Sequence, residues 1–263
     1  MLTYPDIDPI AFAIGPVRIH WYGLTYVAGF IAAWLLARRR SQAPGSTWKP
    51  IDVDDLIFFC AIGVIAGGRL GWVLFYGLQS VIDQPLTLIR IWEGGMSFHG
   101  GLSGVLIALW LFARRRQRHF ADVLDFTAPL PAIGLFAGRI GNFINGELWG
   151  KPTDLPWGML VDDKVLHPSQ LYEATLEGLV LFAIVWLYSS KPRPRLAPAG
   201  LFLAGYALFR IAVEFVRVPD TNLGYLALDW VTMGQVLSLP MLIAGLTMLA
   251  WAWRRRQPSG NFA

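Results

Sequence analysis

Long stretches of mostly apolar sequence constrain what this chain can fold into more than any other feature. A helix needs about 20 largely apolar residues to cross the hydrocarbon of a bilayer, and the chain holds enough of them for several crossings. Only 15% of its residues are charged, whereas a water-soluble domain carries about 25%. We therefore expect an all-α integral membrane protein that forms a single polytopic domain over residues 1–263. The seven expected transmembrane helices cover residues 20–37, 55–77, 98–113, 122–141, 169–189, 198–217 and 232–253.

Clusters of arginine and lysine predict how these spans are oriented. The clusters follow the first, third, fifth and seventh spans, at Arg38–Arg40 with Lys49, Arg114–Arg116 with Arg118, Lys191 to Arg195, and Arg254–Arg256. With seven spans they all lie on one side, and the positive-inside rule makes that side cytoplasmic. The amino terminus is then outside and the carboxy terminus inside. Short interfacial segments and the loops at 78–97 and 142–168 lie outside. No basic residue precedes Arg18, so we expect the first span to be retained rather than cleaved as a signal peptide.

Polar residues gather at the ends of the spans that this topology places outside. In the sixth span, Tyr206, Arg210, Glu214 and Arg217 are four, four and three residues apart, which puts them on one helical stripe. The other spans contribute Tyr22, His99, Arg139, Asn142, Asn145, Glu147 and Glu173.

Several of these residues also have purely structural explanations. Arg210 and Glu214 could form an intrahelical ion pair, and Glu173 could simply favour the positive end of its helix. The two tyrosines could belong to the aromatic belt at the membrane interface. His99 is harder to explain in this way, because glycines on both sides of its segment leave room for a ligand.

The chemistry of this set suits an anionic phospholipid. Two or more arginines at the depth of lipid headgroups favour a phosphate, which guanidinium binds through its planar fork. A histidine can take or give a proton near neutral pH. The sequence has no metal-binding spacing, and its single cysteine, Cys60, lies within an apolar run. We therefore expect no metal, no cofactor, no internal nucleophile and no nucleic-acid partner.

These residues do not separate a lipid enzyme from a lipid carrier. An anionic-lipid transporter or scramblase would also use arginines at the outer face, but its polar groups should continue towards the cytoplasmic side. The inner halves of the spans are almost free of charge, which argues against such a pathway. A structural membrane subunit is a further alternative, although it would not need His99 and two arginines at one depth.

Five segments resemble the prolipoprotein diacylglyceryl transferase family, in the family's order. They are HWYG at 20–23, GGMSFHGG at 94–101, GRIGNFINGELWG at 138–150, HPSQLYE at 167–173, and the stretch from Tyr206 to Glu214. The resemblance implies a multi-pass protein of the bacterial inner membrane with seven helices and a site open to the periplasm, which agrees with the periplasmic amino terminus expected from the charge clusters. It implies transfer of the sn-1,2-diacylglyceryl group from phosphatidylglycerol to the lipobox cysteine thiol of a preprolipoprotein signal peptide. A thioether forms and glycerol phosphate is released, as the first step of lipoprotein maturation.

The resemblance also implies a role for each candidate residue. It makes Arg139, Arg210 and His99 catalytic, with Arg139 on the phosphate of phosphatidylglycerol. The remaining residues that would bind this lipid are Tyr22, Asn142, Glu147, Gly150 and Tyr206, and those that would support the site are Asn145, Glu173, Glu214 and Arg217. His99 could accept the thiol proton, or a positive local field could favour the thiolate, and the sequence leaves both open.

Overall fold

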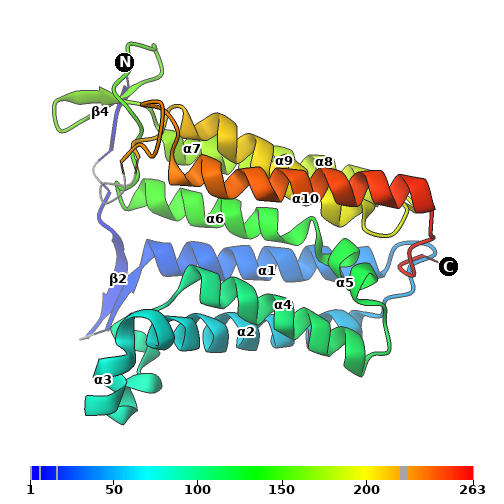
Figure 1. The fold of residues 1–263 in the computed structure, drawn as a ribbon. Helices are drawn as coiled ribbons and strands as arrows, with labels where there is room; N and C mark the ends of the chain where they lie inside the picture. The colour runs from blue at the N-terminus through cyan, green and yellow to red at the C-terminus, as the bar shows by residue number, and fades with distance from the viewer. Residues whose placement is uncertain (1, 6, 16, 220–223, 263) are drawn as a thin grey trace. The chain divides into compact units, whose positions relative to one another are not determined.

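The computed structural model describes residues 2–5, 7–15, 17–219 and 224–262, and most of them lie in helices (Figure 1). The α-helices are α1 (Trp21–Ser41), α2 (Pro50–Trp72), α3 (Leu78–Asp83), α4 (Phe98–Arg115), α5 (Phe120–Thr127), α6 (Leu130–Ile144), α7 (Ser169–Glu173), α8 (Leu181–Ser189), α9 (Ala197–Glu214) and α10 (Met233–Arg255). Two π-helical segments, η1 (Val73–Gly77) and η4 (Ala174–Val180), continue α2 and α7, and two 3-10 turns are η2 (Pro85–Leu88) and η3 (Ile91–Glu93). Each predicted span coincides with a helix or with consecutive helices, so a mainly helical fold is confirmed.

The described residues also form five short strands that were not predicted. In one sheet β1 (Leu2–Thr3) pairs in parallel with β4 (Met159–Val161), which pairs in antiparallel fashion with β5 (Lys164–Leu166). In the other, β2 (Ile10–Ile14) and β3 (Val17–His20) form an antiparallel hairpin. Strands of two to five residues carry too little alternation to be recognised in a sequence. The parallel pair also joins segments that lie far apart along the chain.

Among the described residues, four helical stretches are long and apolar enough to cross a membrane: Pro50–Asp83, Ser169–Ser189, Ala197–Glu214 and Met233–Arg255. The pair α5 and α6 makes a fifth if it is one span bent by 43°. The bend falls at Pro129, because proline has no N–H with which to continue a helix. The predicted spans α1 and α4 are helical, but Trp and Tyr in α1, and glycines and arginines in α4, lower their hydropathy. The total of seven spans stays a prediction.

The chain divides into two compact units. Unit 1 consists of Met1–Leu36 and Asp125–Ser259, and unit 2 of Ala37–Leu124 and Gly260–Ala263. The chain therefore passes from unit 1 to unit 2 within α1 and returns within α5. The prediction of one membrane domain stays a prediction.

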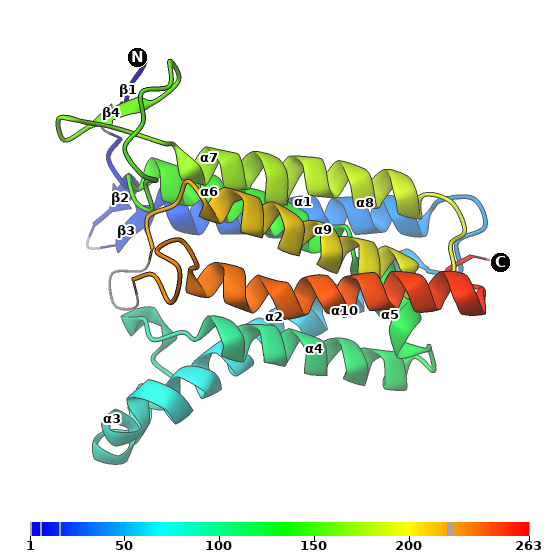
Figure 2. The ribbon, with the colours of Figure 1, turned by 45° about the horizontal axis from the view of Figure 1, so that its top comes forward.

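Small residues let the helices of unit 1 approach closely. A Cβ on Gly29 of α1 would lie 2.9 Å from the Cβ of Ala137 in α6, and Gly178 of η4 also faces α6. Helices α9 and α10 lie side by side, with Gly200 against Gly245 (Figures 1 and 2). The buried apolar core consists of Ala128, Ala132, Leu181 and Val185, surrounded by Phe182, Leu201, Phe202, Tyr206 and Phe209. This packing holds α6, α8 and α9 together. Of these helices, α6 carries Arg139 and Asn142, and α9 carries Tyr206, Arg210 and Glu214.

Unit 2 is built on a glycine-lined contact between α2 and α4. Gly63, Gly67 and Gly71 of α2 face Gly100 and Gly104 of α4, and a Cβ on any of them would come within 3.0 Å of the opposite backbone. Close approach of this kind is how helices associate in lipid, where there is no hydrophobic driving force between them.

Replacing Gly104 by alanine is expected to destabilise this helix pair. The added methyl group would lie 2.0 Å from the carbonyl oxygen of Gly63, so the helices must separate, and overpacking costs about 1–3 kcal/mol. Thermal unfolding of the purified protein in detergent should show a lower Tm. Gly134→Ala in α6 is the matched control, because nothing lies within 4 Å of its Cβ. A wild-type Tm for Gly104→Ala would contradict the close packing.

Candidate functional site

A buried carboxylate in unit 1, that of Glu173 at the end of α7, pairs with three arginines. Its Oε2 lies 2.9 Å from Nε of Arg139 in α6. Its Oε1 accepts hydrogen bonds from Nη1 of Arg210 in α9 and, at 2.6 Å, from Nη1 of Arg217, which follows α9. Glu173 is fully buried, and a buried carboxylate is stable only when opposite charges and hydrogen-bond donors surround it. Glu173 therefore ties α6, α7 and the end of α9 to one point.

Two further carboxylates face the same arginines. Glu214 pairs with Nη2 of Arg210 and, at 3.1 Å, with Nε of Arg217. The hydroxyl of Thr232, which caps α10, donates to Glu214 at 2.6 Å. Glu177 lies 3.8 Å from Arg210 and is also fully buried. We call these three arginines and three glutamates the Glu173 cluster. The pairing of Arg210 with Glu214 that the helical spacing suggested is confirmed.

Arg139 is the most exposed arginine of the Glu173 cluster. Its Nη1 donates to Oδ1 of Asn142 at 3.2 Å, and Nδ2 of Asn142 donates to Oε1 of Glu147 at 2.6 Å. Within the described part of the chain, Nη2 of Arg139 has no hydrogen-bond acceptor. The side chain is 19% exposed, against 14% for Arg210 and 11% for Arg217. Its guanidinium is therefore fixed on one edge and available on the other.

The segment after α6 is held by contacts that reach it from distant parts of unit 1. The Tyr4 hydroxyl lies 2.9 and 3.0 Å from the carbonyl oxygens of Phe143 and Ile144, in the last turn of α6. The side chain of Gln170 donates to the carbonyl oxygen of Glu147. These contacts fix the loop that begins with the Asn145 turn, so that Glu147 faces Asn142. Asn145 itself lies 3.5 Å from the Glu147 carboxylate.

Gly150 joins the signature segment to the end of α9. Its N–H donates to the carbonyl oxygen of His167 at 2.9 Å, and it forms an isolated bridge with Arg217. A Cβ at this position would lie 2.5 Å from the carbonyl oxygen of Val216. The close backbone approach explains a glycine here without any contact to a lipid, so its predicted binding role stays a prediction.

The two candidate tyrosines come from different helices, α1 and α9. The ring of Tyr22 in α1 packs against Gly141, and its hydroxyl lies 3.1 Å from that of Tyr26. Tyr206 lies one turn before Arg210 in α9 and packs against the apolar core of unit 1.

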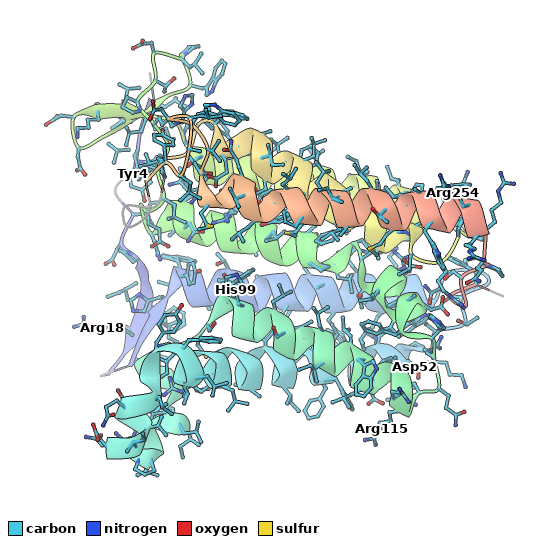
Figure 3. The ribbon with its side chains drawn as sticks, in the orientation of Figure 1. Tyr4, Arg18, Asp52, His99, Arg115 and Arg254 are labelled. Carbon is cyan, nitrogen blue, oxygen red and sulfur yellow. The ribbon has the colours of Figure 1, made fainter. Side chains whose placement is uncertain are left out.

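His99 belongs to unit 2, in the first turn of α4 (Figure 3). Its side chain is exposed, and the helix is capped by Ser97, whose hydroxyl accepts from the N–H of Gly100 at 3.2 Å. The predicted meeting of His99 with Arg139 and Arg210 stays a prediction.

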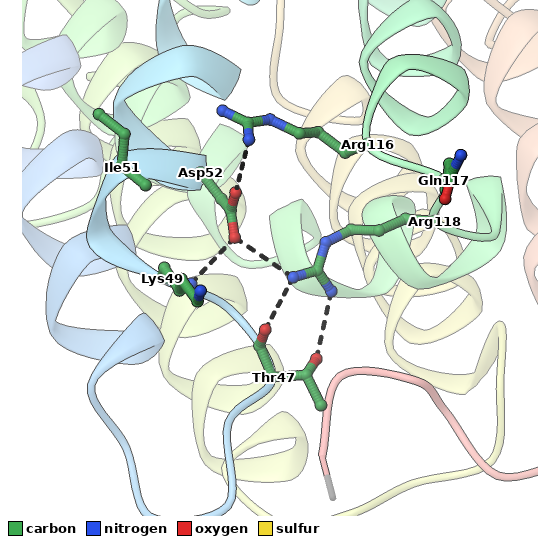
Figure 4. A pocket seen from close by; sticks show the side chains of 7 residues that line it. All are labelled: Thr47, Lys49, Ile51, Asp52, Arg116, Gln117 and Arg118. Carbon is green, nitrogen blue, oxygen red and sulfur yellow. Dashed lines mark hydrogen bonds and ion pairs between the residues drawn. The ribbon is translucent and has the colours of Figure 1, made fainter.

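A polar cavity of about 470 Å³ lies in unit 2, and its residues have a structural role (Figure 4). Arg116 and Arg118 follow α4 and lie 3.5 and 3.3 Å from the carboxylate of Asp52 in α2. Arg118 also donates to the carbonyl oxygen of Thr47 at 2.8 Å. None of the predicted site residues lines this cavity. Both arginines are already paired with Asp52. We therefore interpret these ion pairs as contacts that hold the end of α4 against the start of α2.

Comparisons with known proteins identify the family. A model described as prolipoprotein diacylglyceryl transferase matches residues 9–251. The chain belongs to this family. Three similar proteins, each named phosphatidylglycerol–prolipoprotein diacylglyceryl transferase, cover nearly its whole length. The protein of Solidesulfovibrio magneticus is 57% identical over 99% of both chains, and that of Pseudomonas fluorescens 56% over 100% of both. That of Methylococcus capsulatus is 58% identical over 97% of this chain and 99% of its own.

Membership of the prolipoprotein diacylglyceryl transferase family confirms the resemblance drawn from the five sequence segments. Together with the apolar helices, it makes this chain a multi-pass membrane protein. Three residues around the cluster of this family member were missed as candidates: Glu177, Thr232 and Tyr4. Glu177 carried a usable signal, since it follows Glu173 by four residues and so shares its helix face. Thr232 and Tyr4 contact their partners only through the tertiary fold.

Unit 1 of this diacylglyceryl transferase contains a cavity of about 270 Å³ beside His167. Nδ1 of His167 lies 3.1 Å from the hydroxyl of Tyr172, which also accepts a hydrogen bond from Trp157 at 2.8 Å. Burial, and then the positive charge of Lys151, hold the pKa of His167 below its ordinary value of 6.5. The fold thus favours the neutral form of His167.

Acidification is expected to destabilise the protein in part through His167. Because its pKa is lower in the folded state, its contribution to stability is full above about pH 6.5 and is lost as the pH falls through the lowered value. Lowering the pH from about 7.5 to about 5 should therefore reduce the Tm of the wild type more than that of His167→Gln. Equal changes in Tm for the two proteins would contradict this assignment.

Proposed function

We propose that this chain is an enzyme that transfers the diacylglyceryl group of phosphatidylglycerol to a prolipoprotein. The family match over residues 9–251 and the names of relatives that are 56–58% identical support this reaction. The comparisons give no support to the alternative of an anionic-lipid transporter or scramblase.

The acceptor in this proposal is the thiol of the lipobox cysteine in the preprolipoprotein signal peptide. The sulfur forms a bond to the glyceryl carbon of the lipid, and the bond from that carbon to its phosphate oxygen breaks. The electron pair of the broken bond stays on the phosphate oxygen. The phosphate group thereby changes from the monoanionic diester of phosphatidylglycerol towards the dianionic monoester of the departing glycerol phosphate. The thiol proton passes to a base, and the thioether product starts lipoprotein maturation.

Arg139 binds the phosphate of phosphatidylglycerol. The observation that carries this assignment is the unused edge of its guanidinium, because Glu173 and Asn142 hold Nε and Nη1 while Nη2 has no acceptor among the described residues. A guanidinium that is already oriented can bind a phosphate oxygen with little reorganisation. Tyr22, Asn142, Glu147, Gly150 and Tyr206 line the lipid site around it.

Arg210 stabilises the charge that grows on the leaving phosphate. It lies beside Arg139 through their shared partner Glu173, and preorganised cationic donors are worth most in a site that excludes water. Glu173, Glu214 and Arg217 hold it in place, and Asn145 supports the loop that carries Glu147. His99 is the candidate acceptor of the thiol proton.

The site lies at the outer face of the bacterial inner membrane, in a seven-span arrangement with a periplasmic amino terminus. Glu214 contacts Thr232 at the start of α10, whereas Arg254 and Arg255 end the same helix. The 23 residues of α10 rise about 35 Å at 1.5 Å per residue, which matches the thickness of a bilayer. Figure 3 places Tyr4 and Arg18 at the end of unit 1 opposite Arg254. If the basic end is cytoplasmic, the Glu173 cluster opens to the periplasm.

An assay with purified components tests the reaction. The protein is incubated in phosphatidylglycerol vesicles with a lipobox peptide, and mass spectrometry should detect a peptide that carries one diacylglyceryl group on its cysteine. The same peptide with serine in place of the cysteine is the control and should remain unmodified. Folded protein that forms no thioether, but moves labelled phosphatidylglycerol between leaflets, would favour the transporter alternative.

A further inference from the structure

Arg69 of α2 is a buried arginine that binds backbone carbonyl groups. Its exposure is 4%, and no acidic side chain among the described residues pairs with it. Instead it makes five hydrogen bonds to backbone carbonyl oxygens between residues 87 and 95. Nε donates to Leu88 at 3.1 Å, Nη1 to Gly94 and, at 3.0 Å, to Gly95, and Nη2 to Thr87 and, at 3.3 Å, to Arg90.

The segment that Arg69 binds has little regular structure of its own. It holds two short 3-10 turns, and Gly94 and Gly95 take positive φ values of 88° and 76°. Few of its carbonyl groups are therefore satisfied by helical or sheet hydrogen bonds, so they are available to a donor from another segment. The rigid fork of one guanidinium supplies donors in several directions at once, which a lysine ammonium on its flexible stem does not.

The same segment leads directly into the turn that carries His99. The N–H of Ser97 donates to the carbonyl oxygen of Gly68, the neighbour of Arg69, at 2.9 Å. Ser97 then caps α4, and Gly100 packs on the backbone of α2. The residues before and after His99 are thus both attached to the part of α2 that contains Arg69.

We propose that Arg69 is a positioning residue that holds residues 87–97 and thereby places His99 for the transfer reaction. This inference rests on the proposed function, in which His99 takes part in turnover. It assigns Arg69 no contact with substrate, since its five hydrogen bonds all go to the protein backbone.

Kinetics of Arg69→Lys test the proposal. A lysine keeps the charge but cannot serve carbonyl groups in three directions, so kcat should fall at least tenfold, while KM for phosphatidylglycerol should change less than twofold. Arg18→Lys is the matched control, because Arg18 is exposed on β3, and it should keep wild-type kinetics. Hydrogen exchange of residues 87–99 should also become faster in Arg69→Lys, a readout that needs no activity.

A double-mutant cycle shows whether the effect passes through His99. If it does, adding Arg69→Lys lowers the rate of thioether formation in the wild-type background but not in the His99→Gln background. The rates are measured in single turnovers with excess enzyme. Gly95→Ala is the second variant, because its Cβ would lie 2.8 Å from Nη1 of Arg69, and it should act in the same way. Wild-type kcat in both variants, or effects that multiply with His99→Gln, would overturn the proposal. Absence of thioether formation by the wild type would instead defeat the proposed function, and the exchange result would still stand.

Discussion

Glu173→Gln is expected to abolish diacylglyceryl transfer and to destabilise the protein by about 3–5 kcal/mol, the usual cost of breaking a buried ion pair. Glutamine keeps the size of the side chain but removes the negative charge that Arg139, Arg210 and Arg217 share. Three guanidinium groups then face one another with only Glu177 and Glu214 to balance them. Thermal unfolding in detergent and the thioether assay measure the two effects.

Two further variants make the Glu173 result specific. Glu173→Asp keeps the charge on a shorter side chain, so it should retain more stability than Glu173→Gln and little activity. Asp163→Asn, in the exposed turn between β4 and β5, removes a carboxylate that has no such partners and should behave as wild type. Unchanged Tm and activity in Glu173→Gln would show that the cluster is not what holds the arginines.

Arg139→Ala is expected to lower kcat/KM by at least about 10²–10³-fold, the typical loss when one preorganised donor is removed from a transition state. The physical reason is that the free edge of Arg139 binds the phosphate both in the lipid and as its charge grows. Rates of thioether formation at several phosphatidylglycerol concentrations measure the change. Because Glu173 keeps Arg210 and Arg217 as partners, the loss of stability should be smaller than in Glu173→Gln.

Arg139→Lys separates charge from geometry at the same position. An ammonium keeps the charge but not the planar fork that Glu173 and Asn142 orient, so activity should lie well below wild type and above that of Arg139→Ala. Arg18→Ala removes an exposed arginine of the same unit and serves as the control. If Arg139→Ala turned over at the wild-type rate, the phosphate would have to bind elsewhere, and Arg210 would become the first candidate.

Local sequence patterns were sufficient to predict the features that are determined within a single helix. Apolar length predicted where the helices lie, because crossing lipid demands about 20 apolar residues wherever a span occurs. Helical periodicity predicted the stripe from Tyr206 to Arg217, and the ion pairs of Arg210 and Arg217 with Glu214 follow it. The five motif segments predicted the family, which the match over residues 9–251 confirms.

Packing between distant segments decided the rest. Glu173 meets Arg210 and Arg217 across 37 and 44 residues, and no periodic pattern records which helix faces which. For the same reason the sequence suggested a helix-end preference for Glu173, whereas the fold makes it the common partner of three arginines. Tyr4 at the end of α6 and Arg69 beneath residues 87–95 are further cases. Periodicity specifies which side of a helix is polar, but only the close contact of helices through small residues specifies which polar groups meet.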